Sequence, residues 1–195
     1  MRSLCGFGVA AVVLLLALAG CAAASMSTAD RRLYAAKTAD EAKAALAVGA
    51  ALNARHVENG QQTPLMSAVL QGRTAVVEAL LAAGADFTIP EKDGYTPMHG
   101  AGFQGRDDIV PLLAARGVPV SDVHHTDGYT PLQRACWGSE PRHTATVRAL
   151  LRHGASPEEL KGCHPTRNAE TATLKAEVLA ELKARRRMSS GDGDL

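Results

Sequence analysis

Aromatic residues are scarce in this sequence, and its positive and negative charges nearly cancel. Phe, Trp and Tyr make up 4% of the 195 residues, and 21 Lys and Arg stand against 20 Asp and Glu. Proteins that bind nucleic acid usually carry a strongly basic face, so this balance argues against a nucleic-acid partner. The one basic run, Arg185 to Arg187, is interpreted as complementing the dipole at the C-terminal end of the last helix.

The motifs of common catalytic sites are also missing. The sequence has no nucleophile elbow, no phosphate-binding glycine loop and no paired-carboxylate motif. Seven histidines are present, but none has a zinc-like spacing to cysteine or carboxylate. We therefore expect no enzyme, no cofactor and no metal. The competing class, an enzyme or metal handler built on the histidines, would be favoured by stoichiometric metal in the purified protein.

The apolar run near the N-terminus is too short to cross a bilayer. Residues 9–18 span about ten positions, whereas a transmembrane helix needs roughly 20. Because this run follows Arg2, it indicates a signal peptide. At its end, residues 18–21 read Leu-Ala-Gly-Cys and resemble the lipobox of bacterial lipoproteins, whose cysteine is lipidated and becomes the first residue of the mature protein.

This resemblance implies a lipoprotein signal peptide over residues 1–20 and a membrane anchor of acyl chains (palmitate among them) on Cys21. Each buried CH₂ would contribute about 0.8 kcal/mol to membrane affinity. Ala22 rather than Asp follows the cysteine, which implies the periplasmic side of the outer membrane. The alternative is an ordinary secretory signal cleaved nearby, which would leave a soluble periplasmic protein.

Two of the four cysteines remain for other roles. Cys5 would leave with the signal peptide and Cys21 would carry lipid, so Cys136 and Cys163 are left. The periplasm permits disulfides, and a bridge requires Cα atoms within about 7 Å. We expect two reduced or buried thiols in preference to a bridge.

A repeated motif organises the rest of the chain. Asp-Gly-Tyr-Thr-Pro occurs at residues 93–97 and 127–131, and Thr-Pro also occurs at 63–64, so the threonines lie 33 and 34 residues apart. In each unit Thr can cap a helix whose first position is Pro. A second apolar helix follows and ends at a glycine, where a left-handed cap is favoured. The third unit holds three extra residues, which we place between its two helices, in residues 139–143.

Thr-Pro-Leu-x-x-Ala, a glycine between the helices and a Gly-Ala-Asp ending resemble the ankyrin repeat, whose period is about 33 residues. The resemblance implies an all-α solenoid of about five helix-turn-helix units with short hairpin loops, each unit burying its apolar face against its neighbours. It covers residues 30–187, with regular repeats at about 58–157 and degenerate caps at about 30–57 and 158–187.

The ends of the chain depart from the repeat. We expect a lipidated tether over residues 21–29 and, in the first cap, a second helix that starts at Asp40. A long closing helix is predicted to run to about Arg187, because no glycine interrupts that segment. Residues 188–195 are rich in Ser, Gly and Asp and are predicted to be disordered.

Large side chains occupy equivalent places in the repeats. Tyr95 and Tyr129 precede Thr, while Leu70, Phe103 and Trp137 lie seven residues after it. In ankyrin-repeat proteins these are variable positions on the concave face, and aromatic residues are enriched in binding hot spots. We therefore predict that these five residues form a partner-binding surface. The alternative is that the rings cover the joints between neighbouring repeats.

Other residues are weaker candidates for contact. The hairpin tips would contribute Glu91, Lys92, Asp93, His124, His125 and Asp127, although such charges are usually solvated loop residues. The insertion, with residues 141–143, would lie beside Trp137. His99 falls at the histidine of Thr-Pro-x-His, where the resemblance implies a structural hydrogen-bonding role.

These features predict a non-enzymatic, membrane-anchored, periplasmic module that binds an unidentified protein on its concave face as a monomer. A specific version is an immunity protein that neutralises a periplasmic toxin, and a chaperone or assembly factor fits equally well. A further class is an envelope-structure protein that binds peptidoglycan or lipid, which a pull-down with sacculi would separate from the others.

Overall fold

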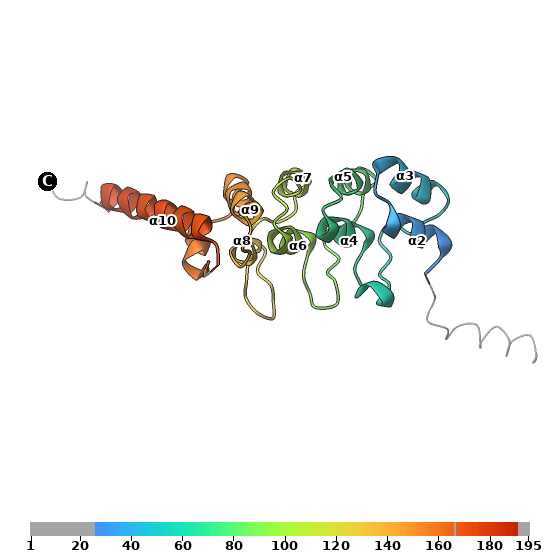
Figure 1. Cartoon of the computed structure of the whole chain (residues 1–195), viewed down its shortest axis with the longest axis horizontal. Coiled ribbons are helices and arrows are strands. Elements are labelled where there is room, and N and C mark those ends of the chain that lie inside the picture. The colour runs from blue at the N-terminus through green and yellow to red at the C-terminus, as the bar shows by residue number, and fades with distance from the viewer. Residues whose placement is uncertain (1–25, 166, 191–195) are drawn as a thin grey trace, which may run out of the picture.

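The computed structural model of the protein describes residues 26–165 and 167–190, and all regular elements within them are helical. Two parallel rows of helices run along the molecule, with hairpin loops projecting from one of them (Figure 1). The first row holds α2 (Thr28–Ala35), α4 (Pro64–Gln71), α6 (Pro97–Gln104) and α8 (Pro131–Ala135). The second row holds α3 (Ala39–Ala47), α5 (Thr74–Ala82), α7 (Val110–Ala115) and α9 (Pro141–Arg152). The predicted all-α solenoid is confirmed.

The first helix of each regular unit begins at Thr-Pro, as predicted. The N–H of Met66 donates to Thr63 Oγ1 at 3.1 Å, which satisfies one of the free donors at the helix start. Thr96 differs, because its hydroxyl lies 2.9 Å from His99 Nδ1. The other ring nitrogen of His99 lies 3.2 Å from the carbonyl oxygen of Tyr129 in the next unit. The structural role predicted for His99 is confirmed.

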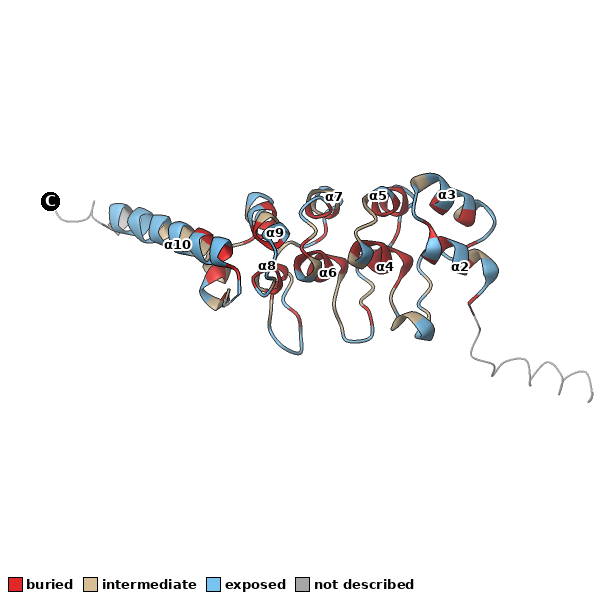
Figure 2. Cartoon of the chain, viewed as in Figure 1, coloured by how far each residue is buried: buried red, intermediate tan, exposed pale blue. Residues whose placement is uncertain are grey.

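Neighbouring units are joined by apolar packing and by a recurring polar contact. Arg106 donates to the carbonyl oxygen of Leu70, at the end of α4, over 3.0 Å. One unit further on, His143 Nε2 lies 3.3 Å from the carbonyl oxygen of Phe103, at the end of α6. Buried positions follow the facing surfaces of both rows (Figure 2). The large side chains that are at most 1% exposed include Leu33, Leu65, Leu80, Met98, Ile109, Leu113, Leu132, Leu150 and Leu160.

The three extra residues of the third unit lengthen a helix, which corrects the predicted insertion between helices. Pro141 already stands at the first position of α9, which is 12 residues long, against 9 for α5. Proline is favoured at that position because it lacks the N–H that would go unpaired there. Residues 141–143 therefore form the first turn of α9, and His143 is buried.

Cys136 and Cys163 form a disulfide with a Cα–Cα distance of 5.6 Å, so the expectation of two thiols is wrong. The physical reason lies in the segment before Cys163, which forms the 3₁₀ helix η2 (Pro157–Gly162). The carbonyl oxygen of Glu159 accepts a hydrogen bond from Gln133 Nε2 at 3.2 Å. This contact docks η2 on α8 and brings Cys163 to the end of that helix.

The closing helix α10 (Ala169–Ser190) has 22 residues and continues three residues past the predicted end at Arg187. Residues 188–190, which were predicted to be disordered, are therefore helical. No described helix is both long and apolar enough to span a bilayer. The predicted signal peptide, Cys21 and most of the tether lie outside the described residues, as do residues 191–195 of the predicted disordered tail. In the first cap, α3 begins one residue before Asp40, and a second 3₁₀ helix, η1 (Val57–Asn59), lies in the loop that follows.

Candidate functional site

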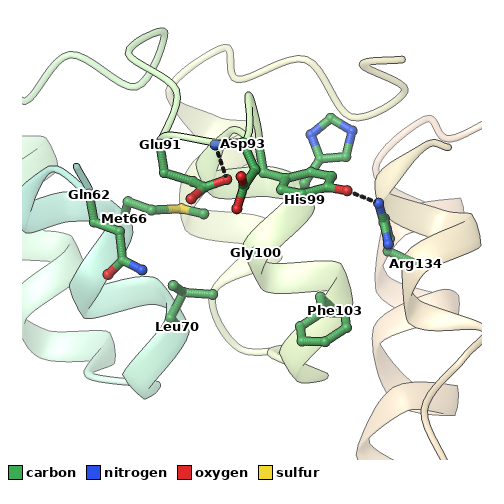
Figure 3. A pocket seen from close by; sticks show the side chains of 10 residues that line it. Gln62, Met66, Leu70, Glu91, Asp93, His99, Gly100, Phe103 and Arg134 are labelled. Carbon is green, nitrogen blue, oxygen red and sulfur yellow. Dashed lines mark hydrogen bonds between the residues drawn. The ribbon is translucent and has the colours of Figure 1, made fainter. Parts of the chain in front are cut away.

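A pocket of about 280 Å³ opens between α4, α6 and the hairpin that joins the first and second regular units (Figure 3). Three of the five residues predicted to bind a partner line it. The full lining is Gln62, Met66, Leu70, Glu91, Asp93, Tyr95, His99, Gly100, Phe103 and Arg134. Pockets for drug-sized ligands usually enclose about 300–1,000 Å³, so this one has room for one or two side chains.

The floor of the pocket is apolar. Met66 and Leu70 come from α4, and Gly100 and Phe103 from the facing side of α6 (Figure 3). A Cβ at Gly100 would lie 3.2 Å from both Leu70 Cδ2 and Met66 Cε. The absence of a side chain at this position therefore keeps the floor open. Phe103 remains 52% exposed.

Carboxylates from the hairpin form the opposite wall. Glu91 is only 8% exposed, and its Oε1 accepts a hydrogen bond from the N–H of Asp93 at 3.0 Å. The N–H of Glu91 in turn donates to the carbonyl oxygen of Tyr95 at 3.1 Å. The backbone thus holds Glu91 and Asp93 side by side above the apolar floor (Figure 3).

Arg134 closes the far end of the pocket and is the centre of an aromatic cluster. Its guanidinium carbon lies 4.5 Å from the ring centroid of Tyr95, 4.4 Å from that of Trp137 and 5.4 Å from that of Tyr129. It also donates to the hydroxyl of Tyr95 and to Asp127 Oδ2. Arginine between aromatic faces contributes both cation–π attraction and packing. The five predicted residues therefore form one continuous surface, and Arg134, which was not predicted, joins its two halves. One half lines the pocket, and the other consists of Tyr129 and Trp137.

The tyrosines also cover joints between repeats, as the alternative interpretation proposed. The ring of Tyr95 stacks on that of His124 in the following hairpin, with 3.9 Å between the ring centroids. The Tyr95 hydroxyl donates to Asp127 Oδ2 at 2.8 Å. The rings of Tyr129 and Trp137 pack edge to face, with 4.8 Å between their centroids. Tyr95 thus belongs both to the pocket and to the contact between hairpins, whereas Tyr129 and Trp137 lie on the other side of Arg134.

Hydrogen bonds within this cluster fix its charges. Burial raises the pKa of Tyr95, and the hydrogen bond to Asp127 raises it further. Desolvation opposes ionisation of Asp127, but hydrogen bonds from Tyr95, His124 and the N–H of Tyr129 outweigh it and lower the pKa of Asp127 to about 2. The Asp127 carboxylate is therefore negative at neutral pH and balances Arg134.

The hairpin tips divide into exposed and buried residues. Lys92, Asp93, His125 and Asp127 are exposed. His124 is only 4% exposed, with Nδ1 2.8 Å from Asp127 and Nε2 2.8 Å from the carbonyl oxygen of Asp93. His124 is thus a connector between hairpins, not the surface contact or solvated loop residue that we expected. Packing between adjacent hairpins, which a single repeat does not reveal, is the reason.

The residues predicted near the insertion also contact the protein itself. His143 packs against Gly138, where an added Cβ would clash with the ring, and Arg142 pairs with Glu140 at 3.1 Å. Among the described residues, no three His, Cys, Asp or Glu side chains come together as a metal site would require.

Stacked helix pairs, projecting hairpins and a pocket between neighbouring repeats define a helical-repeat scaffold of the kind that offers an extended binding surface. Comparison with known families identifies which one. A family model described as ankyrin repeats in many copies matches residues 46–101, and a second, described as three copies of the ankyrin repeat, matches residues 85–161. Together they cover more than half of the chain, which therefore belongs to the ankyrin-repeat family.

Ankyrin repeats are generally modules for protein–protein interaction, and the matches indicate no enzyme family. Sequence reasoning missed Arg134 and Gly100. Arg134 was hidden because the equivalent position, four residues after Thr, holds Ser67 and Gly100 in the other regular units. No repeat pattern therefore marks it.

Proposed function

We propose that this protein is a non-enzymatic, membrane-anchored interaction module of the bacterial periplasm that binds a protein partner on its concave face. The observation that carries the proposal is the exposure of large rings on that face. Phe103, which lines the pocket, is 52% exposed, and Trp137, on the other side of Arg134, is 39% exposed. Large apolar groups left exposed on a monomer usually mark a binding site, and aromatic residues dominate such sites.

The proposed location rests on the lipobox-like residues 18–21 and on the cysteines. Lipid on Cys21 would hold the domain at the membrane without a transmembrane helix. The disulfide between Cys136 and Cys163 supports an oxidising compartment, because structural disulfides are rare in reducing ones. Cys21→Ala should release the protein from the membrane fraction and abolish labelling by a palmitate analogue. Retention of the variant at the membrane would contradict the anchor.

The binding surface is tested by affinity capture from envelope extracts. We expect a protein partner to be recovered with the wild-type chain and lost with the double variant Phe103→Ala and Trp137→Ala. Both rings are substantially exposed, so the melting temperature should change little. A matched control is Val48→Ala, which removes an apolar side chain that is 61% exposed beside α3. It should leave capture unchanged.

Two other results would overturn the proposal. Capture that is equally efficient with the double variant would move the interface away from this surface. Recovery of purified sacculi or lipid vesicles in place of a protein would make the chain an envelope-structure protein. The identity of a captured protein would also distinguish an immunity role from a chaperone role, because a toxin would be neutralised in a direct activity assay.

A further inference from the structure

The pocket between α4 and α6 is equivalent by repeat symmetry to the place that Arg134 fills one unit further on. Arg134 stands four residues after Thr130, and Gly100 stands four residues after Thr96. In the same way Asp127 corresponds to Asp93, Trp137 to Phe103, and Tyr129 to Tyr95. The second-unit members of these pairs, Asp93, Phe103 and Tyr95, all line the pocket. The chain thus repeats these three kinds of side chain and supplies the guanidinium only once, whereas Tyr95, which Arg134 contacts from the preceding unit, is replaced by Gln62 in the pocket.

We infer that this pocket receives a basic side chain, arginine above all, from an extended segment of the partner polypeptide. The inference rests on the proposed function and names the chemistry that the partner must bring. In the third unit the chain itself shows how such a group is held, because Arg134 pairs with Asp127 and lies against Trp137. In the second unit, Asp93 and Phe103 occupy the corresponding positions.

Glu91 provides a second and independent indication. It is 8% exposed and lines the pocket, yet only its Oε1 has a hydrogen-bond partner in the described part of the chain, the N–H of Asp93. Neither Glu91 nor Asp93 forms an ion pair with any described residue. A carboxylate in a largely buried residue that lacks a cation can gain a charge-assisted hydrogen bond, so a basic group brought by the partner would be favoured here.

The other charged side chains nearby do not meet this need. Arg134 lines the pocket, but it is committed to Asp127 and to the hydroxyl of Tyr95 at the far end. Arg55 and Lys92 line a second depression, which Glu91 and Asp93 also line, but neither cation forms an ion pair with these carboxylates in the described part of the chain. The pocket therefore keeps an excess of negative charge on its hairpin wall.

The floor fits the stem of the same side chain. Lys and Arg bury their methylene groups against apolar surface while the charged head reaches polar partners. Met66 and Leu70 offer such a surface, Met being adaptable in shape, and the exposed ring of Phe103 can stack on a guanidinium. A purely apolar anchor would leave Glu91 without a cation, and an acidic one would be repelled.

The test is selection of a phage-displayed library of random 12-residue peptides on the full chain. Enriched peptides should carry Arg or Lys next to an apolar residue. The double variant Glu91→Gln and Asp93→Asn should weaken a resynthesised peptide about tenfold or more. Replacing the peptide's arginine by citrulline, which is neutral and nearly isosteric, should cost a similar factor on the wild-type chain and little on the double variant, since coupled residues are non-additive.

Two chain variants control for charge and for shape. Glu78→Gln with Asp107→Asn removes the same charge from exposed positions outside this pocket, and it should leave peptide binding within about twofold of the wild type. Gly100→Arg places a guanidinium where the third unit has Arg134, and it should block the peptide. Melting temperatures measured by circular dichroism would show that every variant is folded.

The outcomes separate this inference from the proposed function. Peptides that bind on the concave face, lost with Phe103→Ala and Trp137→Ala but insensitive to Glu91→Gln, Asp93→Asn and citrulline, would overturn the pocket's charge preference and leave the interaction module intact. Enrichment of acidic or purely apolar peptides would do the same. Failure to enrich any peptide above the library background would count against both.

Discussion

The joints between the first helices of the regular repeats share part of their framework and differ in their contents. Between α6 and α8, Arg134 fills the space, pairs with Asp127 and contacts three aromatic rings. Between α4 and α6, Gly100 leaves the corresponding position without a side chain, and a pocket of about 280 Å³ remains. One joint is closed by the chain's own cation, whereas the other keeps its carboxylates without one.

Glycines in α6 separate the two joints further. On the side facing α8, a Cβ at Gly102 would clash with the carbonyl oxygen of Pro131, so the two helices approach closely. On the side facing α4, a Cβ at Gly100 would meet only the ends of the Leu70 and Met66 side chains. Two glycines in one helix thus serve different ends, close packing in one joint and an open floor in the other.

The largest expected effect on stability comes from removing the disulfide between Cys136, at the end of α8, and Cys163. Cys136→Ser and Cys163→Ser, singly or together, should lower the free energy of unfolding by about 3–4 kcal/mol, because the bridge closes a long loop in the unfolded chain. Chemical denaturation would measure the loss. Wild-type protein treated with a reductant should fall to the stability of the variants, and an unchanged midpoint would contradict a structural bridge.

The second-largest effect on stability comes from removing the Arg134 side chain from the joint between α6 and α8. Arg134→Ala should cost about 2 kcal/mol, since it leaves Asp127 without its cation and removes packing among the rings, although partial exposure of the carboxylate moderates the loss. Urea denaturation gives the measurement. Arg134→Lys should recover only part of the stability, because lysine keeps the charge but lacks the planar group that stacks. Equal stability of the lysine variant and the wild type would argue that charge alone matters.

A matched pair of glycine substitutions compares the joints directly. Gly102→Ala should destabilise by about 1–3 kcal/mol through overpacking against α8. Gly100→Ala should be nearly neutral, because the methyl group meets flexible side-chain ends and alanine favours the helix by about 0.5–1 kcal/mol. Melting temperatures of the two variants would show the difference. Equal losses would mean that both joints are packed alike.

The smallest effect is the pH dependence contributed by Asp127. Its pKa is lowered in the folded protein to about 2 from an ordinary value of 3.8. The stabilisation is therefore fully present above pH 3.8 and is lost as the pH falls toward 2. Since the carboxylate is partly exposed, the contribution should stay below about 1 kcal/mol. The stability difference between wild type and Asp127→Asn, followed from pH 5 to 2, isolates this group, and a difference independent of pH would contradict it.

Repeat spacing was enough to predict the helix pairs, their Thr-Pro starts and the solenoid, because these depend on local caps and on apolar periodicity. It was also enough to place Leu70, Tyr95 and Phe103 on one surface. The third unit was less predictable. Three additional residues can extend a helix or a loop at similar cost, and only the packing of His143 against Gly138 and the end of α6 determines which occurs.

The amino-acid sequence by itself determined that this protein is an ankyrin solenoid, because a period of 33 to 34 residues with capping and terminating residues in register leaves each unit dependent on its neighbours for a core. The tertiary structure alone decided the contents of the joints. Four features depend on contacts between residues about 27 to 39 positions apart. They are the disulfide, the burial of His124, the position of the Arg134 side chain and the open pocket at Gly100. Only stacking of the repeats brings such residues together, so no local sequence pattern could predict these contacts.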